Sequence, residues 1–592
     1  MSETRINPAA FGTMPEKEKR LMLGNEAVAF GAWEAGVKVV ASYPGTPSTE
    51  ITEVISKLPD VNVQWAPNEK VAAEVAFGAA MTGARSLTCM KHVGLNVAAD
   101  PVFTAAYTGV NGGMIIAVAD DPAMHSSQNE QDSRYYARAA HIPMLEPADS
   151  QECSDFVKLG YRISEELDTP VFLRLTTRIA HARSEVALER REDVPVKPYE
   201  KNVMKNVMMP GMARKRHLHV EKREEFLVRA ANEMPINRVE MRDSKVGIIT
   251  SGACYQYVRE ALPEASTLKL GMVYPLPMEL IRKFASKVEK LIVIEELEGL
   301  IEKDIAAAGI PVEGKKYTGI QGELSVEKLR NIFRGEAVPE VEGANELPAR
   351  PPVLCPGCPH RGVFFVLNRL GLRVMGDIGC YTLAALPPLN AIDACLCMGA
   401  SIGMASGAER ANGKEFSKKT VAVLGDSTFI HSGITGLVDA VYNQESITVL
   451  ILDNRITGMT GHQQNPATGL DIHNQPAPQL NLEKMVEACG VNDIQVVDPF
   501  DLASMHKAVS GAVSRDEVSV IIARRPCALL SKQTCPPLRI DGCKNCGACM
   551  KLSCPAIERG ENGVSINPAL CIGCGMCAQV CPFKAIKSGE EA

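Results

Sequence analysis

The stretch TVAVLGDSTFIHSGITG, residues 420–436, begins with an apolar run that stops at Gly425 and turns polar at Asp426. The run predicts a buried strand, and the glycines at 433 and 436 predict the start of a helix whose amides can face anionic oxygens. A second apolar run, ITVLILDN at 447–454, follows after one helix-length segment. Strands and helices that alternate in this way indicate a parallel sheet with helices on both faces.

Polar residues follow both predicted strands and can hold a metal ion. Asp426 and Asn454 come at the carboxyl ends of neighbouring strands, where open α/β sheets bind their ligands. Mg²⁺ takes hard oxygen ligands and usually bridges a diphosphate, so we expect these side chains and the Ile456 carbonyl to bind it. The gap of 26 residues between Ser427 and Asn454 resembles the thiamine-diphosphate motif, with Ser427 where that motif has glycine. Gly425 and Ser427 are predicted to lie against the cofactor, although an ordinary strand-end turn is the alternative.

Length and composition bound the class of protein. A chain of 592 residues is too long for one core, and its 46 % apolar content is ordinary for a soluble protein. A net charge of −7 argues against a nucleic-acid partner, and no apolar run reaches the ~18 residues of a membrane span. Residues 1–20 lack the apolar core of a secretory signal, so we expect a cytoplasmic protein. The cytoplasm keeps thiols reduced, so the 19 cysteines, most of them from Cys355 onward, favour metal binding over disulfides.

The C-terminal segment carries two cysteine runs, CKNCGACMKLSCP at 543–555 and CIGCGMCAQVCP at 571–582. Their spacing closely matches that of bacterial two-cluster ferredoxins, in which the fourth cysteine of each run binds the other cluster. A zinc site or a disulfide knot is the alternative, but zinc needs only four ligands in a closed tetrahedron. The first run has four residues rather than three before its last cysteine, which could tune or destabilise one cluster. The predicted ligand sets are Cys543, Cys546, Cys549 and Cys581 for one [4Fe-4S] cluster and Cys571, Cys574, Cys577 and Cys554 for the other.

Further segments resemble a known family over nearly the whole chain. They include SYPGTPSTEI (42–51), APNEKVAAEVAFGAA (66–80), KHVGLNVAADP (91–101), DDPAMHSSQNEQDSR (120–134), CPGCPHR (355–361), DIGCYTL (377–383) and CMGASIG (397–403). With the GDSTFIHSG segment and the cysteine tail, they resemble the 2-oxoacid:ferredoxin oxidoreductase family, and within it the large (α) subunits of the indolepyruvate type. The stretches 186–243 and 336–352 are less alike.

The resemblance implies thiamine-diphosphate chemistry, with particular residues of the first domain in the site. Glu69 would be the carboxylate against the aminopyrimidine ring, where proton exchange activates the cofactor. Thr46 would donate a hydrogen bond to the 2-oxoacid carboxylate. Arg138, with Arg134 in reserve, would pair with the same carboxylate, although a surface ion pair is the alternative for either. The remaining implied contacts are His125 with Ser126 in the pocket, Gly94 with Asn96 at the cofactor or substrate, and Gly399 with Ser401 at the diphosphate.

The resemblance also implies a third [4Fe-4S] cluster beside the thiamine. Relatives carry a C-x2-C pair, a later Gly-Cys step and a Pro-Cys step near the domain end, and this chain has all three. A structural cysteine pair in a tight turn is the alternative. The predicted ligands are Cys355, Cys358, Cys380 and Cys527.

The implied fold class is α/β, with several parallel-sheet domains of the thiamine-diphosphate type and a C-terminal α+β ferredoxin domain with two clusters. The pyrimidine-binding and diphosphate-binding domains would face each other across a crevice between chains or domains. The predicted boundaries are 1–185 for the pyrimidine-binding domain, 186–243 for a charged linker or insertion, 244–340 for a transketolase C-terminal-like domain, 353–532 for the diphosphate-binding domain and 535–592 for the ferredoxin-like domain.

The implied reaction is oxidative decarboxylation of an aryl 2-oxoacid. Electrons would pass singly through the clusters to ferredoxin, and the acyl group would pass to coenzyme A. The implied partner is a small β subunit with a γ-type domain, in an α2β2 assembly. Three alternatives stay open: the same chemistry on another 2-oxoacid such as pyruvate or a branched-chain acid, a non-oxidative decarboxylase, and a non-catalytic electron-transfer subunit.

Overall fold

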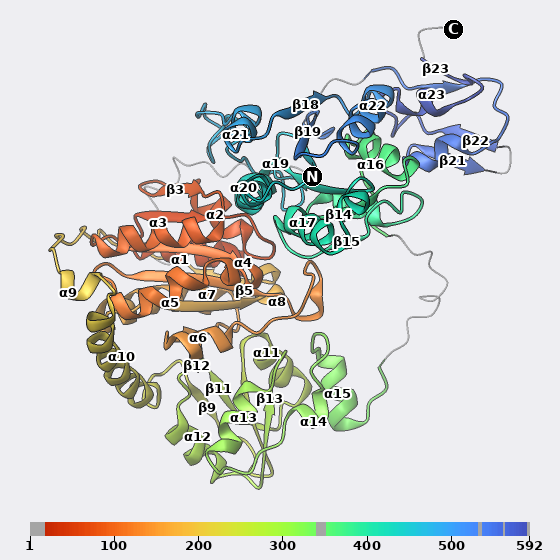
Figure 1. Ribbon diagram of the computed structural model, residues 1–592. Coiled ribbons are helices and arrows are strands. Elements are labelled where there is room, and N and C mark those ends of the chain that lie inside the picture. The colour runs from red at the N-terminus through yellow and green to blue at the C-terminus, as the bar shows by residue number, and fades with distance from the viewer. Residues whose placement is uncertain (1–17, 339–350, 531–534, 561–562, 589–592) are drawn as a thin grey trace. The chain divides into compact units, whose positions relative to one another are not determined.

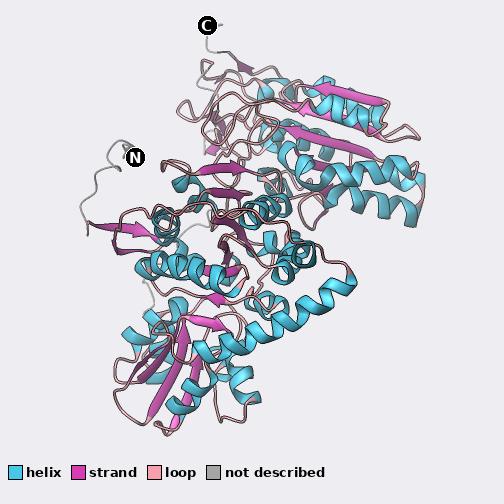
Figure 2. Ribbon diagram, turned by 90° about the vertical axis from the view of Figure 1, so that its left-hand side faces the viewer, coloured by secondary structure: helices cyan, strands magenta, loops and turns pink. Residues whose placement is uncertain are grey.

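The computed structural model describes residues 18–338, 351–530, 535–560 and 563–588. The chain divides into two compact units, Met1–Asn345 and Glu346–Ala592. Both contain sheets of mainly parallel strands covered by helices (Figures 1 and 2), which confirms the predicted α/β class. Most of the predicted linker 336–352, and the N-terminal residues 1–17, lie outside the described residues. Within the described ranges, every helix is too short or too polar to cross a lipid bilayer.

The first unit is built on a seven-stranded sheet in which six strands are mutually parallel and the edge strand β12 is antiparallel to β6. The central strands are buried along their whole length, as expected for apolar runs in a sheet covered on both faces. In spatial order the strands are β12 (Met272–Tyr274), β6 (Met144–Leu145), β7 (Val171–Thr176), β5 (Met114–Asp120), β4 (Ser86–Lys91), β2 (Val39–Ser42) and β3 (Asn62–Trp65).

Two helices that begin at the carboxyl edge of this sheet carry predicted site residues in their first turns. Helix α3 (Glu69–Met81) begins just after β3, and the Asn68 side chain caps it by accepting the Val71 amide at 2.9 Å. Helix α4 (His92–Val97) begins where β4 ends. Because β3 and β4 are parallel members of the same sheet, the starts of both helices lie at the same edge.

A four-stranded sheet completes the first unit and shares a hydrophobic core with the first sheet. Buried Ile249 and Leu268 of this sheet belong to one core with Met144 and Phe172 of the other. The chain segment that supplies β10, β11 and β13 also supplies β12, the edge strand of the seven-stranded sheet. In spatial order the four strands are β13 (Lys290–Ile294), β10 (Val246–Ser251), β11 (Ser266–Leu270) and β9 (Arg238–Glu240).

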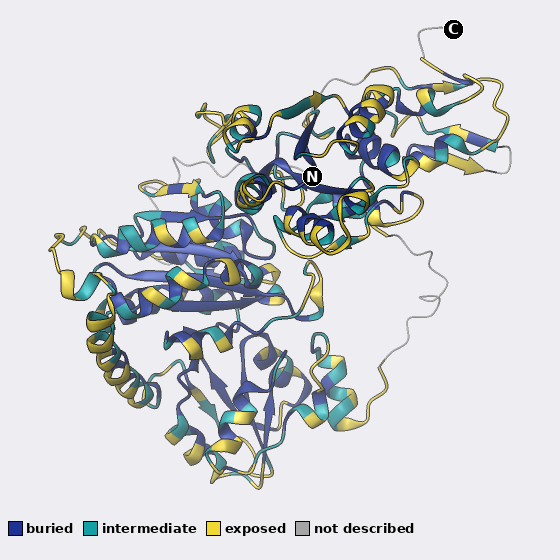
Figure 3. Ribbon diagram, viewed as in Figure 1, coloured by how far each residue is buried: buried dark blue, intermediate teal, exposed yellow. Residues whose placement is uncertain are grey.

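The charged segment 186–243 contains a long helix, α10 (Pro210–Ala231), where we predicted a linker or insertion. Its buried residues recur at helical spacing along one face, and the rest of its surface is half-buried or exposed (Figure 3). The buried Arg223 guanidinium donates to the Ala106 carbonyl at 3.1 Å, which ties α10 to α5 (Ala99–Thr108). The charged segment therefore includes a helix that packs on the first unit through one face.

The second unit is built on a six-stranded sheet in which every pair of neighbouring strands is parallel. The predicted strands around Gly425 and Asn454 are its two central members, β16 and β17, and both are fully buried. In spatial order the strands are β15 (Ala394–Cys395), β14 (Arg373–Gly376), β16 (Thr420–Gly425), β17 (Thr448–Asp453), β19 (Ser519–Arg524) and β18 (Asp493–Val497).

The chain leaves β16 through a helix with an irregular turn. A short helix, α19 (Asp426–Thr428), passes into a π-helical turn, η5 (Phe429–Gly433), and then into α20 (Ile434–Tyr442). A π turn inside a helix is rare and often marks a functional site. The predicted helix after Gly425 is therefore present, with its regular hydrogen bonding interrupted next to the predicted metal ligand.

The C-terminal segment folds as two short antiparallel ribbons with two short helices, η6 (Ala548–Leu552) and α23 (Met576–Val580). It packs onto the six-stranded part of the same unit. Phe365 and Phe500 from that part contact its core. The Gln579 side chain accepts the Leu502 amide at 3.1 Å and donates to the Phe500 carbonyl at 2.8 Å. The ribbons are β20 (Arg539–Ile540) with β23 (Ile586–Lys587), and β21 (Ile557–Gly560) with β22 (Gly563–Ile566).

Candidate active site

Asp426 lies at the carboxyl end of β16 with one carboxylate oxygen unsatisfied. The residue is 2 % exposed. Its Oδ1 accepts the Ser427 amide at 2.8 Å, whereas Oδ2 has no hydrogen-bond partner among the described residues. Burial and the nearby Asp453 carboxylate raise the pKa of Asp426 to about 7. A bound cation would stabilise the ionised carboxylate, so the unsatisfied oxygen fits the predicted Mg²⁺.

The neighbouring strand β17 ends in a turn that carries the other predicted magnesium ligands. Asn454 and Ile456 are buried, and Arg455 between them has a φ of 61°. A non-glycine residue in this left-handed region is strained, and such residues gather at functional sites. Among the described residues, no three His, Cys, Asp or Glu side chains are arranged to hold a metal ion. An ion at this edge would therefore need amide and carbonyl oxygens in addition to Asp426.

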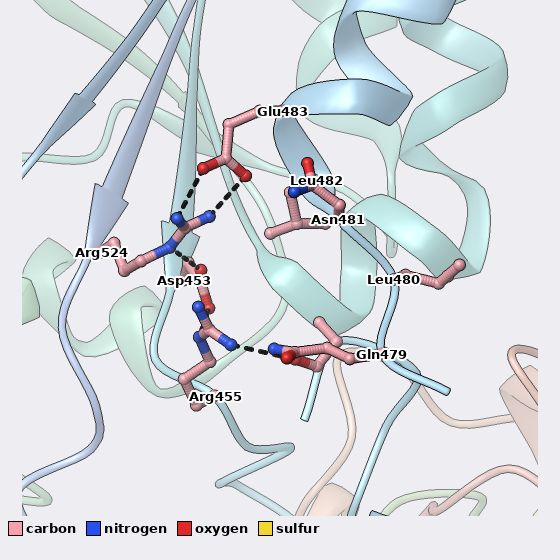
Figure 4. Close-up of a pocket in the computed structure, with 9 residues that line it drawn as sticks. Asp453, Arg455, Gln479, Leu480, Asn481, Leu482, Glu483 and Arg524 are labelled. Atoms are coloured by element: carbon pink, nitrogen blue, oxygen red, sulfur yellow. Dashed lines mark hydrogen bonds and ion pairs between the residues drawn. The ribbon is translucent and has the colours of Figure 1, made fainter. Parts of the chain in front are cut away.

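A polar pocket lies beside this turn, and two arginines that line it pair with a second acidic residue, Asp453 (Figure 4). Arg524 donates from Nε to Asp453 Oδ2 at 2.6 Å, and Arg455 Nε lies 3.3 Å from Oδ1. Arg524 also donates to both carboxylate oxygens of Glu483, at 2.6 and 2.8 Å. Since Asp453 is held by two guanidinium groups, Asp426 remains the carboxylate available to a cation.

The sequence patterns did not point to Asp377, whose side chain contacts the start of α17 (Ala400–Asn412). It accepts the Gly399 amide at 3.0 Å and the Ser401 amide at 3.3 Å. Burial raises the pKa of Asp377 to about 6. The amides of both residues that were predicted to touch the diphosphate therefore already have an acceptor. Asp377 follows β14 directly, and an acid at the carboxyl end of a parallel strand was the available signal.

Glu69 and Gly94, two predicted site residues, are brought together by α3 and α4. Glu69 is 5 % exposed. A Cβ built on Gly94 would lie 2.6 Å from Glu69 Oε1, so only glycine leaves room for this carboxylate. Glu74, further along α3, forms an ion pair with Lys70 on the exposed side. Glu69 is thus buried against Gly94 and Glu74 is not; the catalytic role of Glu69 stays a prediction.

Lys91 is a second residue that the sequence analysis missed. It ends β4, is 7 % exposed, and donates to the Ser126 carbonyl at 2.6 Å and to its hydroxyl at 3.3 Å. The Ser126 hydroxyl in turn donates to the Thr46 carbonyl at 3.4 Å. Burial lowers the pKa of Lys91 to about 8, although Asp121 opposes the shift. A buried cation therefore lies beside the predicted substrate loop, and its position in the KHVGLN segment was the available signal.

Both predicted arginines already pair with acidic residues. Arg138 pairs with Asp304 at 2.6 Å and lines a separate surface pocket with His141 and Tyr274. Arg134 is fully buried in ion pairs with acidic residues. His125 adjoins the Ser126 loop, but its half-exposed ring lies 3.0 Å from Glu323. The substrate roles of Arg138 and His125 stay predictions.

The cysteines of the predicted third cluster gather in the second unit. The Cys358 amide donates to the Cys355 carbonyl at 3.1 Å in a tight turn. Burial, followed by the neighbouring Cys355 and Cys380 thiols, raises the pKa of Cys358 to about 12. Burial raises the pKa of Cys527, and Cys355 adds to the shift. Cys355 therefore lies near each of the other three thiols.

This cysteine group adjoins the turn that carries the predicted magnesium ligands. The Cys527 amide donates to the Asn454 carbonyl at 2.9 Å. A Cβ on Gly458, four residues beyond Asn454, would lie 3.5 Å from the Cys380 sulfur. The turn that follows β17 thus contacts both Cys527 and Cys380, so the predicted metal site adjoins the predicted cluster site.

The cysteines of the tail are also brought together in the two predicted sets. Cys543, Cys546, Cys549 and Cys581 line one small cavity. The Asn545 and Ala585 amides donate to two of these sulfurs, Cys543 and Cys581, each at 3.3 Å.

In the second set, burial and the neighbouring Cys554 and Cys571 thiols raise the pKa of Cys574. Burial and the Cys574, Cys554 and Cys571 thiols raise the pKa of Cys577. The four thiolates of a [4Fe-4S] cluster bind four separate iron atoms, so they need not converge as the ligands of one ion do.

Family models match three parts of the chain. "Pyruvate flavodoxin/ferredoxin oxidoreductase, thiamine diP-bdg" matches residues 30–245. "Thiamine pyrophosphate enzyme, C-terminal TPP binding domain" matches 377–523, and "4Fe-4S binding domain" matches 564–587. The fold, the site and these matches define an iron–sulfur 2-oxoacid oxidoreductase that depends on thiamine diphosphate.

Curated relatives match almost the full length. "Indolepyruvate oxidoreductase subunit IorA" of Archaeoglobus fulgidus is 40 % identical over 97 % of this chain and 98 % of the relative. The protein of the same name from Methanothermobacter marburgensis is 40 % identical over 96 % and 97 %. The chain belongs to the family of indolepyruvate oxidoreductase subunit IorA, within the 2-oxoacid:ferredoxin oxidoreductases. A solved structure, 2-oxoglutarate:ferredoxin oxidoreductase from Magnetococcus marinus, matches 54 % of this chain and 65 % of that chain at 17 % identity, with a TM-score of 0.44.

Proposed function

We propose that this chain is the catalytic large subunit of an oxidoreductase that acts on aryl 2-oxoacids of the indolepyruvate and phenylpyruvate type. The reaction converts a 2-oxoacid and coenzyme A to an acyl-CoA and CO₂, and releases two electrons and one proton. The electrons leave one at a time through iron–sulfur clusters to ferredoxin. The observation that carries the proposal is the hydrogen bond from the Cys527 amide to the Asn454 carbonyl, because it joins a predicted cluster ligand to a predicted magnesium ligand.

Thiamine diphosphate, when bound, supplies the electron sink that decarboxylation of a 2-oxoacid needs. Asp426, Asn454 and the Ile456 carbonyl would hold the Mg²⁺ that bridges its diphosphate. Glu69 would exchange a proton with the aminopyrimidine ring, and the lack of a side chain at Gly94 leaves its carboxylate free of a clash. Each of these residues is buried, which excludes water from the groups that hold the cofactor.

The substrate carboxylate would meet Lys91 and the Thr46 loop. A buried ammonium group attracts an anion more strongly than an exposed one, because water screens the interaction less. The Ser126 loop orients Lys91 through the two hydrogen bonds to its ammonium. In this proposal Lys91 takes the part that was predicted for Arg138, whose guanidinium is already paired with Asp304.

The electrons would first reach the cluster on Cys355, Cys358, Cys380 and Cys527. The two clusters of the tail would carry them onward. Cys543 and Cys546 are exposed, so the cluster that they bind is the one best placed to meet an external ferredoxin. The relatives are named as subunits, which supports a partner subunit. We propose that this partner is a small β subunit with a γ-type domain, in an α2β2 assembly in the cytoplasm.

The proposed function is tested by anaerobic turnover of the complex with its small subunit, coenzyme A and ferredoxin. Indolepyruvate, phenylpyruvate, pyruvate, a branched-chain 2-oxoacid and 2-oxoglutarate would be compared by kcat/KM. We expect the two aryl substrates to exceed the others at least about tenfold, and acyl-CoA to form rather than aldehyde. Preference for pyruvate would contradict the aryl assignment, and aldehyde as the sole product would contradict the oxidative reaction.

A further inference from the structure

Arg361 is a buried guanidinium that holds two cysteine loops at once. It is 0 % exposed. Its Nε donates to the Cys355 carbonyl at 3.0 Å, and the Leu354 carbonyl accepts from it as well. Its Nη1 donates to the Leu552 carbonyl at 3.0 Å and to the Ser553 carbonyl. The first two carbonyls belong to the loop of the proposed third cluster, and the other two immediately precede the tail cysteine Cys554.

The loop that contains Cys355 also touches the second cysteine run of the tail, through apolar atoms. Gly357 lies between Cys355 and Cys358, and a Cβ built on it would come within 2.0 Å of Ile572 Cδ1. Ile572 lies between Cys571 and Cys574 of the tail. Gly357 has a φ of 63°, so both its backbone conformation and the close approach require glycine. The two cysteine loops are therefore in direct contact.

The titratable groups that act on Arg361 are cysteines. Burial lowers the pKa of Arg361, and the thiols of Cys554, Cys358, Cys355 and Cys574 oppose that shift. Among the described residues, the groups that shift its pKa are all cysteines and include no carboxylate. A buried cation without an anionic partner is costly, whereas clusters bound by four thiolates are anionic and become more so on reduction.

We propose that Arg361 is a positioning residue that holds the Cys355 loop against the Cys554 loop and raises the reduction potentials of the clusters on both sides. This inference rests on the proposed function, because it needs a cluster on the Cys355 set. In one transfer, the cluster on the Cys355 set loses one electron and the cluster that contains Cys554 gains it. Arg361 also fixes the lengthened segment of the first tail run, since Leu552 and Ser553 lie in its four-residue gap.

The test is a redox titration of the iron-loaded protein with a chemical reductant, followed by electron paramagnetic resonance. Neither thiamine diphosphate nor a 2-oxoacid is added, so the result does not depend on turnover. Wild type is compared with Arg361→Gln, which is neutral, and with Arg361→Lys, which keeps the charge but cannot reach both loops. Arg515→Gln is the matched control, because Arg515 forms surface ion pairs with Asp493 and Glu517 in the same unit.

In Arg361→Gln we expect the equilibrium constant for reduction to fall at least about tenfold, both for the cluster on the Cys355 set and for the cluster that contains Cys554. A tenfold change is about 59 mV for one electron. The cluster on Cys543, Cys546, Cys549 and Cys581 should keep its potential and serves as an internal reference. In Arg361→Lys we expect potentials within about threefold of wild type, but weaker magnetic interaction between the two clusters. Arg515→Gln should match wild type in every respect.

Unchanged potentials in iron-replete Arg361→Gln would overturn the proposal, and so would an equal shift of all the clusters. If Arg361→Gln does not accumulate with its iron, unchanged magnetic interaction in Arg361→Lys would overturn it. An iron count near eight rather than twelve in wild type would remove the cluster on the Cys355 set, and with it the inference. The proposed aryl 2-oxoacid reaction could still stand in that case, because its turnover assay is separate.

Discussion

The amide of Cys527 donates a hydrogen bond to the carbonyl of Asn454 at 2.9 Å. Asn454 follows β17, and Cys527 follows the neighbouring parallel strand β19, so both come from the same edge of the six-stranded sheet. Ligands of open α/β sheets bind at this edge. A residue predicted to hold magnesium and a residue predicted to hold iron are thus one hydrogen bond apart, so a cluster held by Cys527 would lie close to a cofactor held by Asn454.

Replacement of Glu69 by glutamine should lower the rate of ferredoxin reduction by about 100-fold or more, because a positioned acid–base group contributes that much. The amide keeps the size of the side chain but cannot exchange the proton. Glu74→Gln is the control, since Glu74 lies on the same helix in an exposed ion pair with Lys70. Steady-state kinetics with bound thiamine quantified would decide the matter. Equal rates in the two variants would refute the role of Glu69.

Replacement of Gly94 by alanine should displace the Glu69 carboxylate, because the new Cβ would lie 2.6 Å from Glu69 Oε1. We expect turnover to fall at least about tenfold without loss of iron. Gly78→Ala is the matched control: the space around Gly78 is open, and alanine in a helix interior stabilises by about 0.5–1 kcal/mol. The two variants are compared by kcat and by Tm. A fully active Gly94→Ala enzyme would contradict the arrangement described.

Replacement of Asp426 by asparagine should abolish magnesium-dependent retention of thiamine diphosphate, because the carboxylate charge is lost while the shape is kept. Iron content should stay at the wild-type level. Ser427→Gly serves as the comparison, since glycine is the usual residue of the motif at that position. Calorimetric titration of the cofactor with and without Mg²⁺ provides the measurement. Wild-type affinity in Asp426→Asn would exclude this residue as a ligand.

The pKa of Lys91 predicts a pH dependence of substrate binding. Since that pKa lies at about 8 rather than at its usual 10.5, the ammonium loses its charge as the pH rises through 8. The KM for the 2-oxoacid should therefore rise above pH 8 in wild type. It should stay flat to higher pH in Lys91→Arg, because guanidinium remains charged. Lys70→Arg, on the exposed side of α3, should follow wild type. A wild-type KM that does not change between pH 7 and pH 9.5 would contradict the role of Lys91.

The sequence predicted those parts of the site that depend on local pattern. The carboxyl ends of two apolar strands located Asp426 and Asn454, and ferredoxin spacing predicted that Cys581 joins Cys543 across a gap in the chain. Contacts between distant segments were not predictable in this way. Lys91 and Asp377 each stand at the end of a strand, but their partners come from distant segments: Lys91 donates to Ser126, and Asp377 accepts from the amides at the start of α17.

Arg138 shows that sequence position alone does not identify the residue that binds the substrate carboxylate. Its place in the chain agreed with the resemblance, yet helix α6 (Arg134–Ala140) directs it to Asp304. The charged segment 186–243 shows a different limit. Its composition is typical of a solvated surface, and only a few buried positions at helical spacing reveal that α10 packs against α5.

The central claim is that electrons pass from the thiamine site into clusters on this same chain. The most direct measurement mixes the thiamine-loaded, iron-replete protein with its preferred 2-oxoacid under anaerobic conditions, without ferredoxin, and freezes samples for electron paramagnetic resonance. We predict signals of reduced [4Fe-4S] clusters within a single turnover, and none in Glu69→Gln on the same timescale. Release of CO₂ from wild type while every cluster stays oxidised would contradict the account.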